Sequence, residues 1–231
     1  MSISVHRLGQ EGLLIELPGL AQVLALDAAL RAARESSAQA VTATQSLPPA
    51  DPSVALGAVV DVVPAARTLM LTVASPAQLC SVEEAVRALV GTTDLDTGEY
   101  AAGDSIEIPV YYDGPDLEEV ADITGLGRRG VIEVHTGTPW QVAFGGFAPG
   151  FFYLLGGDHR LVVPRRREPR TTVPDGAVAL AGGFSAVYPR SSPGGWQLLG
   201  RTDTVMWDTS ASPPALLRPG MRVRFTDADL S

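Results

Sequence analysis

Four arginines lie close together in this sequence, at Arg165, Arg166, Arg167 and Arg170. A guanidinium group is always charged and can hold a carboxylate or a phosphate through two parallel hydrogen bonds. The segment could therefore bind an anionic ligand. A run of arginines is also an ordinary feature of a solvated surface, and for Arg165–Arg167 this second interpretation is favoured.

The segment from Gly146 to Phe151 sets small residues beside aromatic ones, with the sequence GFAPGF. Glycine lets a backbone approach a ligand closely, and aromatic rings can wall a pocket. Phe147, Pro149 and Gly150 are therefore candidate binding residues. The alternative is a tight corner of a barrel that is packed by its phenylalanines.

Two further polar side chains could do chemistry. His135 could act as a general base or donate to developing negative charge, and it could equally cap the end of its own helix. Gln197 could donate and accept hydrogen bonds in a pocket, or face outward from a strand. The histidines lie far apart in the sequence, and no CxxC or HExxH motif occurs, so no metal site is predicted.

Several reaction classes are excluded by what the sequence lacks. All 17 basic residues are arginine, so the chain itself cannot form a Schiff base, carry biotin or supply the lysine of a Walker A loop. The formal charge of −9 argues against nucleic acid and anionic membranes as partners. Residues 125–130 fit the dinucleotide motif GxGxxG but follow a predicted helix, so a junction between two helices is the better explanation.

The single cysteine, Cys80, excludes an intramolecular disulfide and is predicted to be a buried structural thiol. Residues 1–10 lack the charged and apolar regions of a signal peptide. No apolar run approaches the ~20 residues of a membrane span. We therefore expect a cytoplasmic protein.

The first part of the chain is interpreted as a small α+β domain over residues 1–92. Strands are predicted at 3–8, 13–17, 58–63 and 68–73, a helix at 20–40 and a loop at 45–52. Ser81 and Glu84 have the spacing of a capping box, which predicts that a helix starts at Ser81. Its apolar face would consist of Val82, Ala85, Val86, Leu89 and Val90. Residues 93–103 are polar, contain glycine and are interpreted as a linker.

Residues 104–231 form the second predicted domain. Apolar residues alternate from Ile106 to Tyr112, which predicts a strand, and Pro109 indicates that it lies at an edge. Pro115 is expected at the first position of a helix, with Asp116, Glu118 and Glu119 in its first turn. A second short helix is expected at 129–135. Short apolar runs with frequent Gly and Pro then indicate a β-barrel or sandwich, at 140–144, 161–163, 177–181, 196–199, 204–207 and 221–225.

A long composite pattern runs from His135 to Thr202. It reads HTGTPWQVAFGGFAPGFFYLLGG and then PRRREPRTTVPDGAVALAGGFSAVYPRSSPGGWQLLGRT. In order and spacing it resembles the family variously called 5-oxoprolinase B-type subunit, allophanate hydrolase subunit 1 and Kip inhibitor. The resemblance extends more weakly over residues 8–17 and 57–73, and so covers most of the chain.

The resemblance implies an α+β N-terminal domain followed by a mainly β, cyclophilin-like barrel domain. It also implies the B-type subunit of an enzyme that opens 5-oxoproline to glutamate with ATP and Mg, without a covalently bound cofactor. The implied partners are a C-type subunit, similar to allophanate hydrolase subunit 2, and an A-type subunit. We expect the chain to be inactive alone, with an exposed apolar patch at the C-type interface. Two alternatives stay open: a subunit related to allophanate hydrolase or urea carboxylase, and a histidine-kinase inhibitor that binds without catalysis.

The resemblance also ranks the candidate residues. Arg170, in the matched Pro-Arg element, is the preferred contact for an anionic group of a small-molecule substrate or nucleotide, and Arg201, in the matched Gly-Arg-Thr, is second. His135 matches the family histidine and is the candidate catalytic residue. One departure is Phe184, which stands where relatives often carry glutamine in an AGGQT-type element. Phe184 cannot supply an amide hydrogen bond, so a substrate contact made by that glutamine would be lost here.

Overall fold

The computed structural model describes residues 3–42, 52–95 and 104–230. The chain divides between Tyr100 and Ala101 into two compact units, which are described separately. The division falls inside residues 93–103, for which the sequence predicts a linker. Most of that segment, and most of the loop predicted at 45–52, lies outside the described residues.

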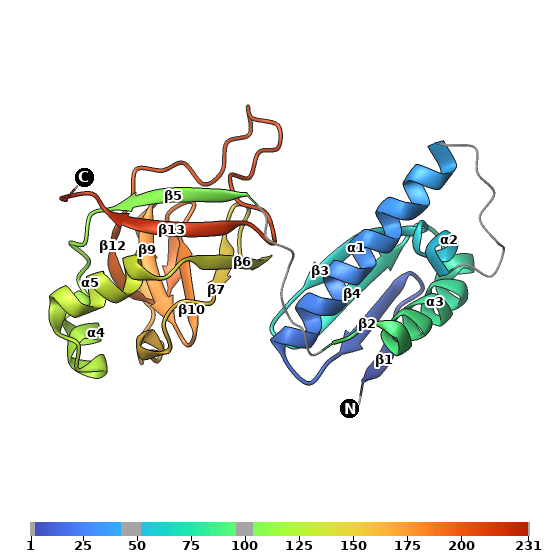
Figure 1. The fold of residues 1–231 in the computed structure, drawn as a ribbon, viewed down its shortest axis with the longest axis horizontal. Coiled ribbons are helices and arrows are strands. Elements are labelled where there is room, and N and C mark those ends of the chain that lie inside the picture. The colour runs from blue at the N-terminus through green and yellow to red at the C-terminus, as the bar shows by residue number, and fades with distance from the viewer. Residues whose placement is uncertain (1–2, 43–51, 96–103, 231) are drawn as a thin grey trace. The chain divides into compact units, whose positions relative to one another are not determined.

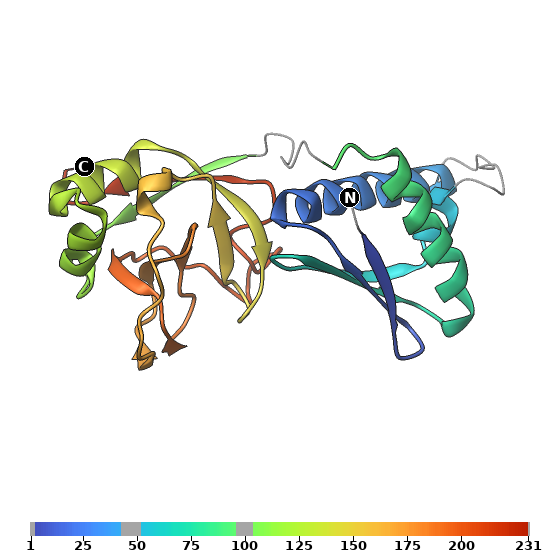
Figure 2. The ribbon, with the colours of Figure 1, turned by 90° about the horizontal axis from the view of Figure 1, so that it is seen from below.

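The N-terminal unit is a four-stranded antiparallel sheet covered by helices. Its order is β1-β2-β4-β3, with β1 at Ser4–Leu8, β2 at Gly12–Glu16, β3 at Val59–Pro64 and β4 at Thr68–Val73. Figures 1 and 2 show α1 (Leu20–Thr42) and α3 (Leu79–Thr92) on the same face of this sheet. Alternate residues of β2 and β4 are buried against these helices, as period-two patterning requires. A short helix, α2 (Pro52–Leu56), precedes β3.

The start of α3 differs from the sequence prediction. Ser75 caps a short 3-10 helix, η1 (Pro76–Gln78), by accepting a hydrogen bond from the Ala77 amide, and α3 follows directly from Leu79. Ser81 therefore lies inside the helix, where its hydroxyl donates to the Gln78 carbonyl at 2.9 Å. The capping-box prediction is wrong because Pro76, whose φ is already helical, starts the turn earlier.

The predicted apolar face of α3 is confirmed, but the prediction for its cysteine is wrong. Val82, Ala85 and Val86 are buried, whereas Cys80 is exposed. Each helical residue turns by about 100°, so Cys80 points away from the face that Val82 and Val86 share. Its sulfur accepts a hydrogen bond from Arg7 at 3.4 Å.

The C-terminal unit is a nearly closed, mainly β barrel, which confirms the predicted fold class. Seven strands form one sheet in the order β12-β9-β10-β7-β6-β13-β5. Their bounds are β5 Ser105–Val110, β6 Trp140–Gly145, β7 Phe152–Leu155, β9 Ala177–Ala181, β10 Phe184–Val187, β12 Gln197–Arg201 and β13 Arg222–Asp227. β13 and β5 pair in parallel, and the other neighbours are antiparallel.

Backbone pairing at one position joins the two edges of this sheet. Tyr111, directly after β5, and Arg201 of β12 exchange both backbone hydrogen bonds, at 2.8 and 2.9 Å. Any Cβ at Gly200 would come within 2.1 Å of the Tyr111 carbonyl oxygen. Closure of the barrel therefore depends on glycine at this position.

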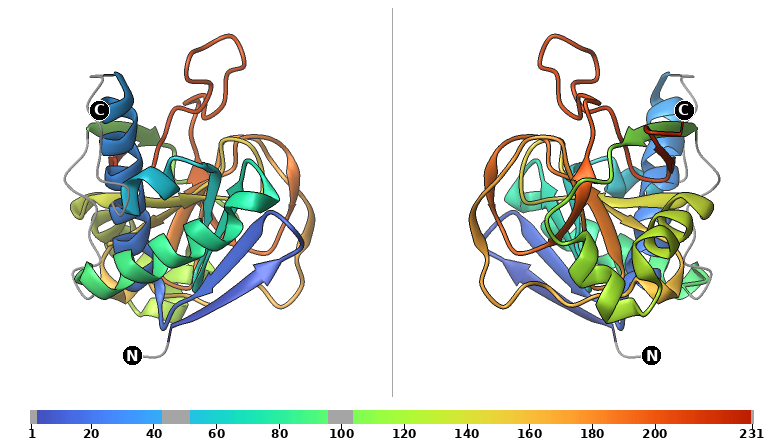
Figure 3. Two further views of the ribbon diagram at one scale, coloured as in Figure 1. Left: turned by 90° about the vertical axis from the view of Figure 1, so that its right-hand side faces the viewer. Right: turned by 90° about the vertical axis from the view of Figure 1, so that its left-hand side faces the viewer.

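Two helices and a small sheet complete the unit. Figure 3 shows α4 (Leu117–Thr124) and α5 (Gly127–Gly137) packed together at the barrel, with the segment between β12 and β13 projecting from it. Gly125 ends α4 in the left-handed conformation, with φ 68°, which confirms the predicted helix junction. β8 (Arg170–Val173) pairs with β11 (Ser192–Gly194), and η2 spans His159–Leu161. The runs at 161–163 and 204–207 form only isolated bridges at Val163 and Trp207 rather than the predicted strands.

Candidate functional site

An aromatic pocket of about 110 Å³ lies in the C-terminal unit. The ring centres of Phe151 and Tyr188 are 5.2 Å apart and those of Phe151 and Trp196 are 5.6 Å apart, both edge to face. Packing of this kind fixes the angles of the rings, so the walls of the pocket are largely preformed. The lining residues are Phe147, Phe151, Tyr153, Arg165, Tyr188, Pro193, Gly194, Gly195 and Trp196.

Arg165 is the one charged residue in that lining. Its guanidinium carbon lies 6.0 Å from the centre of the Trp196 ring, at the outer limit of a cation–π contact. Burial raises the pKa of Tyr188, while the positive charges of Arg165 and Arg170 act in the opposite direction. The pocket therefore combines apolar walls with positive potential.

Phe147 stands at the rim of the pocket in a strained conformation. Its φ is 70° and 61% of the residue is exposed. A bulky side chain in the left-handed region is unusual, and such strain concentrates at functional sites. Its ring centre is 5.2 Å from that of Phe151 and 6.2 Å from that of Tyr188. The loop thus presents an aromatic face at the pocket that solvent can reach.

The other two candidates of this loop shape it rather than line the pocket. Gly150 has φ 80°, and a Cβ there would come within 2.7 Å of the Trp207 Cβ. The turn closes through a hydrogen bond from the Phe151 amide to the Ala148 carbonyl at 3.0 Å. Pro149 is exposed within the turn. The GFAPGF segment is therefore both a tight corner and the rim of a pocket.

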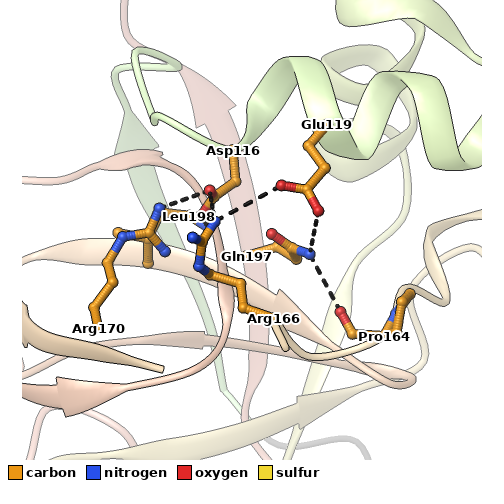
Figure 4. Close-up of polar contacts among 7 residues, drawn as sticks. All are labelled: Asp116, Glu119, Pro164, Arg166, Arg170, Gln197 and Leu198. Carbon is orange, nitrogen blue, oxygen red and sulfur yellow. Dashed lines mark hydrogen bonds and ion pairs between the residues drawn. The ribbon is translucent and has the colours of Figure 1, made fainter. Parts of the chain in front are cut away.

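A buried carboxylate organises the arginines next to the pocket (Figure 4). Oδ1 of Asp116 accepts hydrogen bonds from Arg166 at 2.7 Å and Arg170 at 2.6 Å, and Oδ2 accepts from the Leu198 amide at 2.7 Å. The side chain of Asp116 is 2% exposed. We call Asp116, Arg166 and Arg170 the Asp116 cluster. It ties Arg166, which precedes β8, and Arg170, the first residue of β8, to the start of β12.

Gln197 lies beside this cluster and is 1% exposed. Its Nε2 lies 3.4 Å from Oε1 of Glu119 and 3.4 Å from the Pro164 carbonyl, as Figure 4 shows. Its Oε1, like Nε of Arg166 and Nη1 of Arg170, is buried without a hydrogen-bond partner among the described residues. The alternative of an outward-facing strand residue is wrong for Gln197. Its role in ligand binding stays a prediction.

His135 lies in the barrel core rather than in the pocket. It is fully buried, with Nδ1 2.8 Å from the Tyr112 hydroxyl and Nε2 3.0 Å from the Ser185 hydroxyl. Its ring stacks on Phe225 at 4.4 Å, and burial lowers its pKa to about 3. Both ring nitrogens have partners on other elements, so the side chain does not cap its own helix. A catalytic role for His135 stays a prediction, and these contacts are those of a core residue.

The two arginines preferred from the sequence are separated in the structure. Arg170 belongs to the Asp116 cluster, whereas Arg201 lies where Tyr111 joins the two edges of the barrel sheet. Arg201 donates to Asp113 at 3.0 Å and lies 4.6 Å from the Tyr111 ring centre. Neither arginine lines the pocket. Ligand contacts by either one stay predictions.

Among the described residues, no group of three or more His, Cys, Asp or Glu side chains is placed to hold a metal ion. Within the same part of the chain, no helix combines the length and apolarity needed to cross a membrane.

The sequence profile of the family described as carboxyltransferase domain, subdomain C and D, matches residues 3–217. The chain belongs to this family. Proteins named as the B-type subunit of 5-oxoprolinase, from Bacillus subtilis (strain 168) and Escherichia coli O157:H7, are 47% and 48% identical to it over 123 residues. Those residues are 52% of this chain and 51% and 56% of the two relatives, so the match spans about half the length of each.

Two further comparisons bear on function and fold. The urea amidolyase of Saccharomyces cerevisiae is 36% identical over 121 residues, which cover 47% of this chain and 6% of that protein. The solved structure of TTHA0988 superposes with a TM-score of 0.69 and 34% identity, covering 94% of this chain and 40% of that one. The carboxyltransferase-domain fold therefore extends over both units.

Phe184, where the resemblance implies a glutamine, packs against one wall of the pocket. Its ring centre is 5.4 Å from that of Tyr153, a lining residue, and 6.2 Å from that of Phe144. Phe184 itself does not line the pocket. Phe184 therefore supports the pocket wall through its contact with Tyr153.

The sequence did not predict the role of Asp116 or the position of Arg165. Asp116 was expected in the first turn of a helix, but α4 starts at Leu117 and the carboxylate turns toward partners 50, 54 and 82 residues away. No local signal distinguishes these two roles, because both place an acid just before a helix. Arg165 was assigned to the surface, and it is exposed, yet it lines the pocket. A solvated arginine and a pocket arginine look alike in sequence.

Proposed function

We propose that this chain is the B-type subunit of an ATP-dependent 5-oxoprolinase, a hydrolase that opens 5-oxoproline to glutamate. The observation that carries the proposal is the identity of 47% and 48% to two proteins named as that subunit of 5-oxoprolinase. The match to the carboxyltransferase-domain family over residues 3–217 agrees with it. Because the relatives are about twice as long as the aligned stretch, activity, substrate and partners all belong to the proposal.

The chemistry of the substrate sets what the complex has to do. The lactam of 5-oxoproline is a stable amide, so water alone opens it slowly. Transfer of the terminal phosphoryl group of ATP to the lactam oxygen would release ADP and make the ring carbon open to attack by water. Breaking the ring C–N bond and releasing phosphate would then give glutamate.

The pocket fits the binding part of this chemistry. Its aromatic walls suit the apolar face of a small ring, and its positive potential suits a carboxylate. Mg would accompany ATP, and the lining of this pocket has no carboxylate to hold it. This chain's contribution is therefore to bind and orient the lactam, with the nucleotide and its metal assigned to the complex.

The proposed partners are a C-type and an A-type subunit, and the chain alone is expected to be inactive. An exposed apolar patch would mark the C-type interface. Exposed apolar side chains of the C-terminal unit include Phe147, Val162 and Val205.

The test is ATP hydrolysis by the co-expressed subunits with and without 5-oxoproline. Stimulation by 5-oxoproline that disappears when this chain is omitted would support the proposal. A complex that assembles but shows no stimulation would overturn it. Arg170→Ala is expected to weaken turnover because it removes half of the Asp116 cluster's positive charge. Unchanged turnover would show that Arg170 does not contribute to this activity.

A second candidate function is a role in urea or allophanate metabolism, favoured by the similarity to urea amidolyase. This chain has no lysine, so biotin would have to be attached to a partner. ATP hydrolysis stimulated by urea and bicarbonate, and dependent on a biotin-carrying partner, would identify this function instead.

A further inference from the structure

Arg165, rather than Arg166 or Arg170, is available to an anionic ligand. Arg166 and Arg170 both donate to the buried carboxylate of Asp116, at 2.7 and 2.6 Å. The donors of these two side chains that have no partner among the described residues, Nε of Arg166 and Nη1 of Arg170, are buried away from solvent. No hydrogen bond or ion pair of Arg165 is found within the described parts of the chain, and its guanidinium faces the Trp196 ring.

The pocket itself selects the class of ligand. Its lining contains one cation and no acidic side chain, so it favours a negative group over a positive one. Its volume of about 110 Å³ is below the roughly 300–1,000 Å³ of sites for drug-sized molecules. This volume suits a small ring with one carboxylate better than a whole nucleotide. The aromatic rings supply flat surfaces on which such a ring can lie.

The Asp116 cluster explains how Arg165 is held at the pocket. Arg165 stands between Pro164, whose carbonyl faces Gln197, and Arg166, whose amide donates to the Gly195 carbonyl at 2.8 Å. The Arg166 side chain is fixed by Asp116, which also binds the Leu198 amide. Residues on both sides of Arg165 are therefore anchored to the segment that contains Trp196. Asp116 acts as a positioning residue for Arg165.

From these contacts we infer that Arg165 binds the carboxylate of a small cyclic acid, whose ring lies in the aromatic pocket between Phe147 and Trp196. The inference rests on the proposed function for the identity of the acid, which is then 5-oxoproline. The lactam group would point away from Arg165. Arg165 is thus a specificity-determining residue for the carboxylate, and it takes no part in bond breaking.

The test compares Arg165→Ala with Arg167→Ala in the co-expressed complex. Both changes remove one positive charge from the same exposed segment, but only Arg165 lines the pocket. Loss of a charge-assisted hydrogen bond predicts a rise of about tenfold or more in the KM for 5-oxoproline with Arg165→Ala. Arg167→Ala should leave the KM unchanged, and Arg165→Lys should restore part of the loss because it keeps the charge without the planar fork.

Direct binding to the isolated chain gives a second readout, with L-5-oxoproline and 2-pyrrolidinone as probes. The latter has the same lactam ring without the carboxylate. Trp196 in the pocket wall makes tryptophan fluorescence a suitable signal. Arg165→Ala should weaken the binding of L-5-oxoproline and leave the affinity for 2-pyrrolidinone unchanged.

The outcomes separate this inference from the proposed function. A complex that hydrolyses 5-oxoproline with the same KM in Arg165→Ala, or with equal rises in Arg165→Ala and Arg167→Ala, overturns the inference and leaves the function standing. A complex with no 5-oxoproline-stimulated ATP hydrolysis, whose pocket still binds L-5-oxoproline through Arg165, overturns the function and leaves the site standing.

Discussion

Replacing Asp116 with asparagine should destabilise the C-terminal unit markedly. The carboxylate is 2% exposed and accepts three hydrogen bonds, two from guanidinium groups and one from the buried Leu198 amide. Asparagine has nearly the same shape, but its NH₂ group must face one of these donors. The substitution therefore removes the negative charge and leaves at least one donor without an acceptor.

The expected loss follows from the burial of the three partners. Removing one member of a buried ion pair costs about 3–5 kcal/mol. The Arg166 and Arg170 side chains are 29% and 21% exposed, so hydration of their guanidinium groups compensates part of that loss. The Leu198 amide has no such compensation. We expect the free energy of unfolding to fall by about 3 kcal/mol, toward the lower end of the range.

Urea titration followed by tryptophan fluorescence measures this loss in the relevant unit, because Trp140, Trp196 and Trp207 all lie in it. Asp113→Asn is the matched control. Asp113 and its partner Arg201 are 54% and 53% exposed, so that change should cost less than about 1 kcal/mol. Equal midpoints for the two variants would refute the claim that the Asp116 cluster holds the arginine segment to β12.

Three further predictions concern other residues. Burial lowers the pKa of His135 to about 3, below its ordinary 6.5, so the unfolded chain binds a proton at a pH where the folded chain does not. The free energy of unfolding should therefore fall by about 1.6 kcal/mol between pH 6.5 and pH 5, and an equally steep fall in His135→Gln would contradict this origin. Because Phe147 has φ 70°, Phe147→Gly should be more stable than Phe147→Ala by about 1 kcal/mol in urea titrations, and the reverse order would show that the loop relaxes. Cys80 is exposed, so a thiol reagent should modify it in the folded chain without denaturant, and protection until unfolding would show that the thiol is covered.

Local patterns in the sequence predicted much of the secondary structure. The alternation in β2 and β4 and the helical spacing in α3 involve residues within a few positions of one another, and these elements lie where they were expected. The junction between α4 and α5 was predicted in the same way, and there Gly125 adopts the left-handed conformation that glycine suits. The density of Gly and Pro beyond Pro139 was enough to indicate a barrel or sandwich.

The pairing of the barrel strands could not be read from such patterns. β13 lies beside β5 in parallel although more than a hundred residues separate them, and Tyr111 closes the barrel on Arg201. Strand alternation shows which face is buried, but it does not choose the neighbour across the sheet. That choice depends on how the whole barrel packs.

For the candidate site too, some features follow from local sequence and others only from the tertiary structure. The sequence by itself located the GFAPGF loop and the arginine segment, because composition and the resemblance to a known family mark both. Only the tertiary structure decided which arginine faces the aromatic pocket, since Arg165 and Arg166 are neighbours of the same residue type with different surroundings. Asp116, 50 residues before Arg166 in the sequence, forms ion pairs with Arg166 and Arg170. Arg165 is not part of these ion pairs and lines the pocket. The strength of an ion pair depends on distance in space and on burial, and neither is encoded in the spacing of residues along the chain.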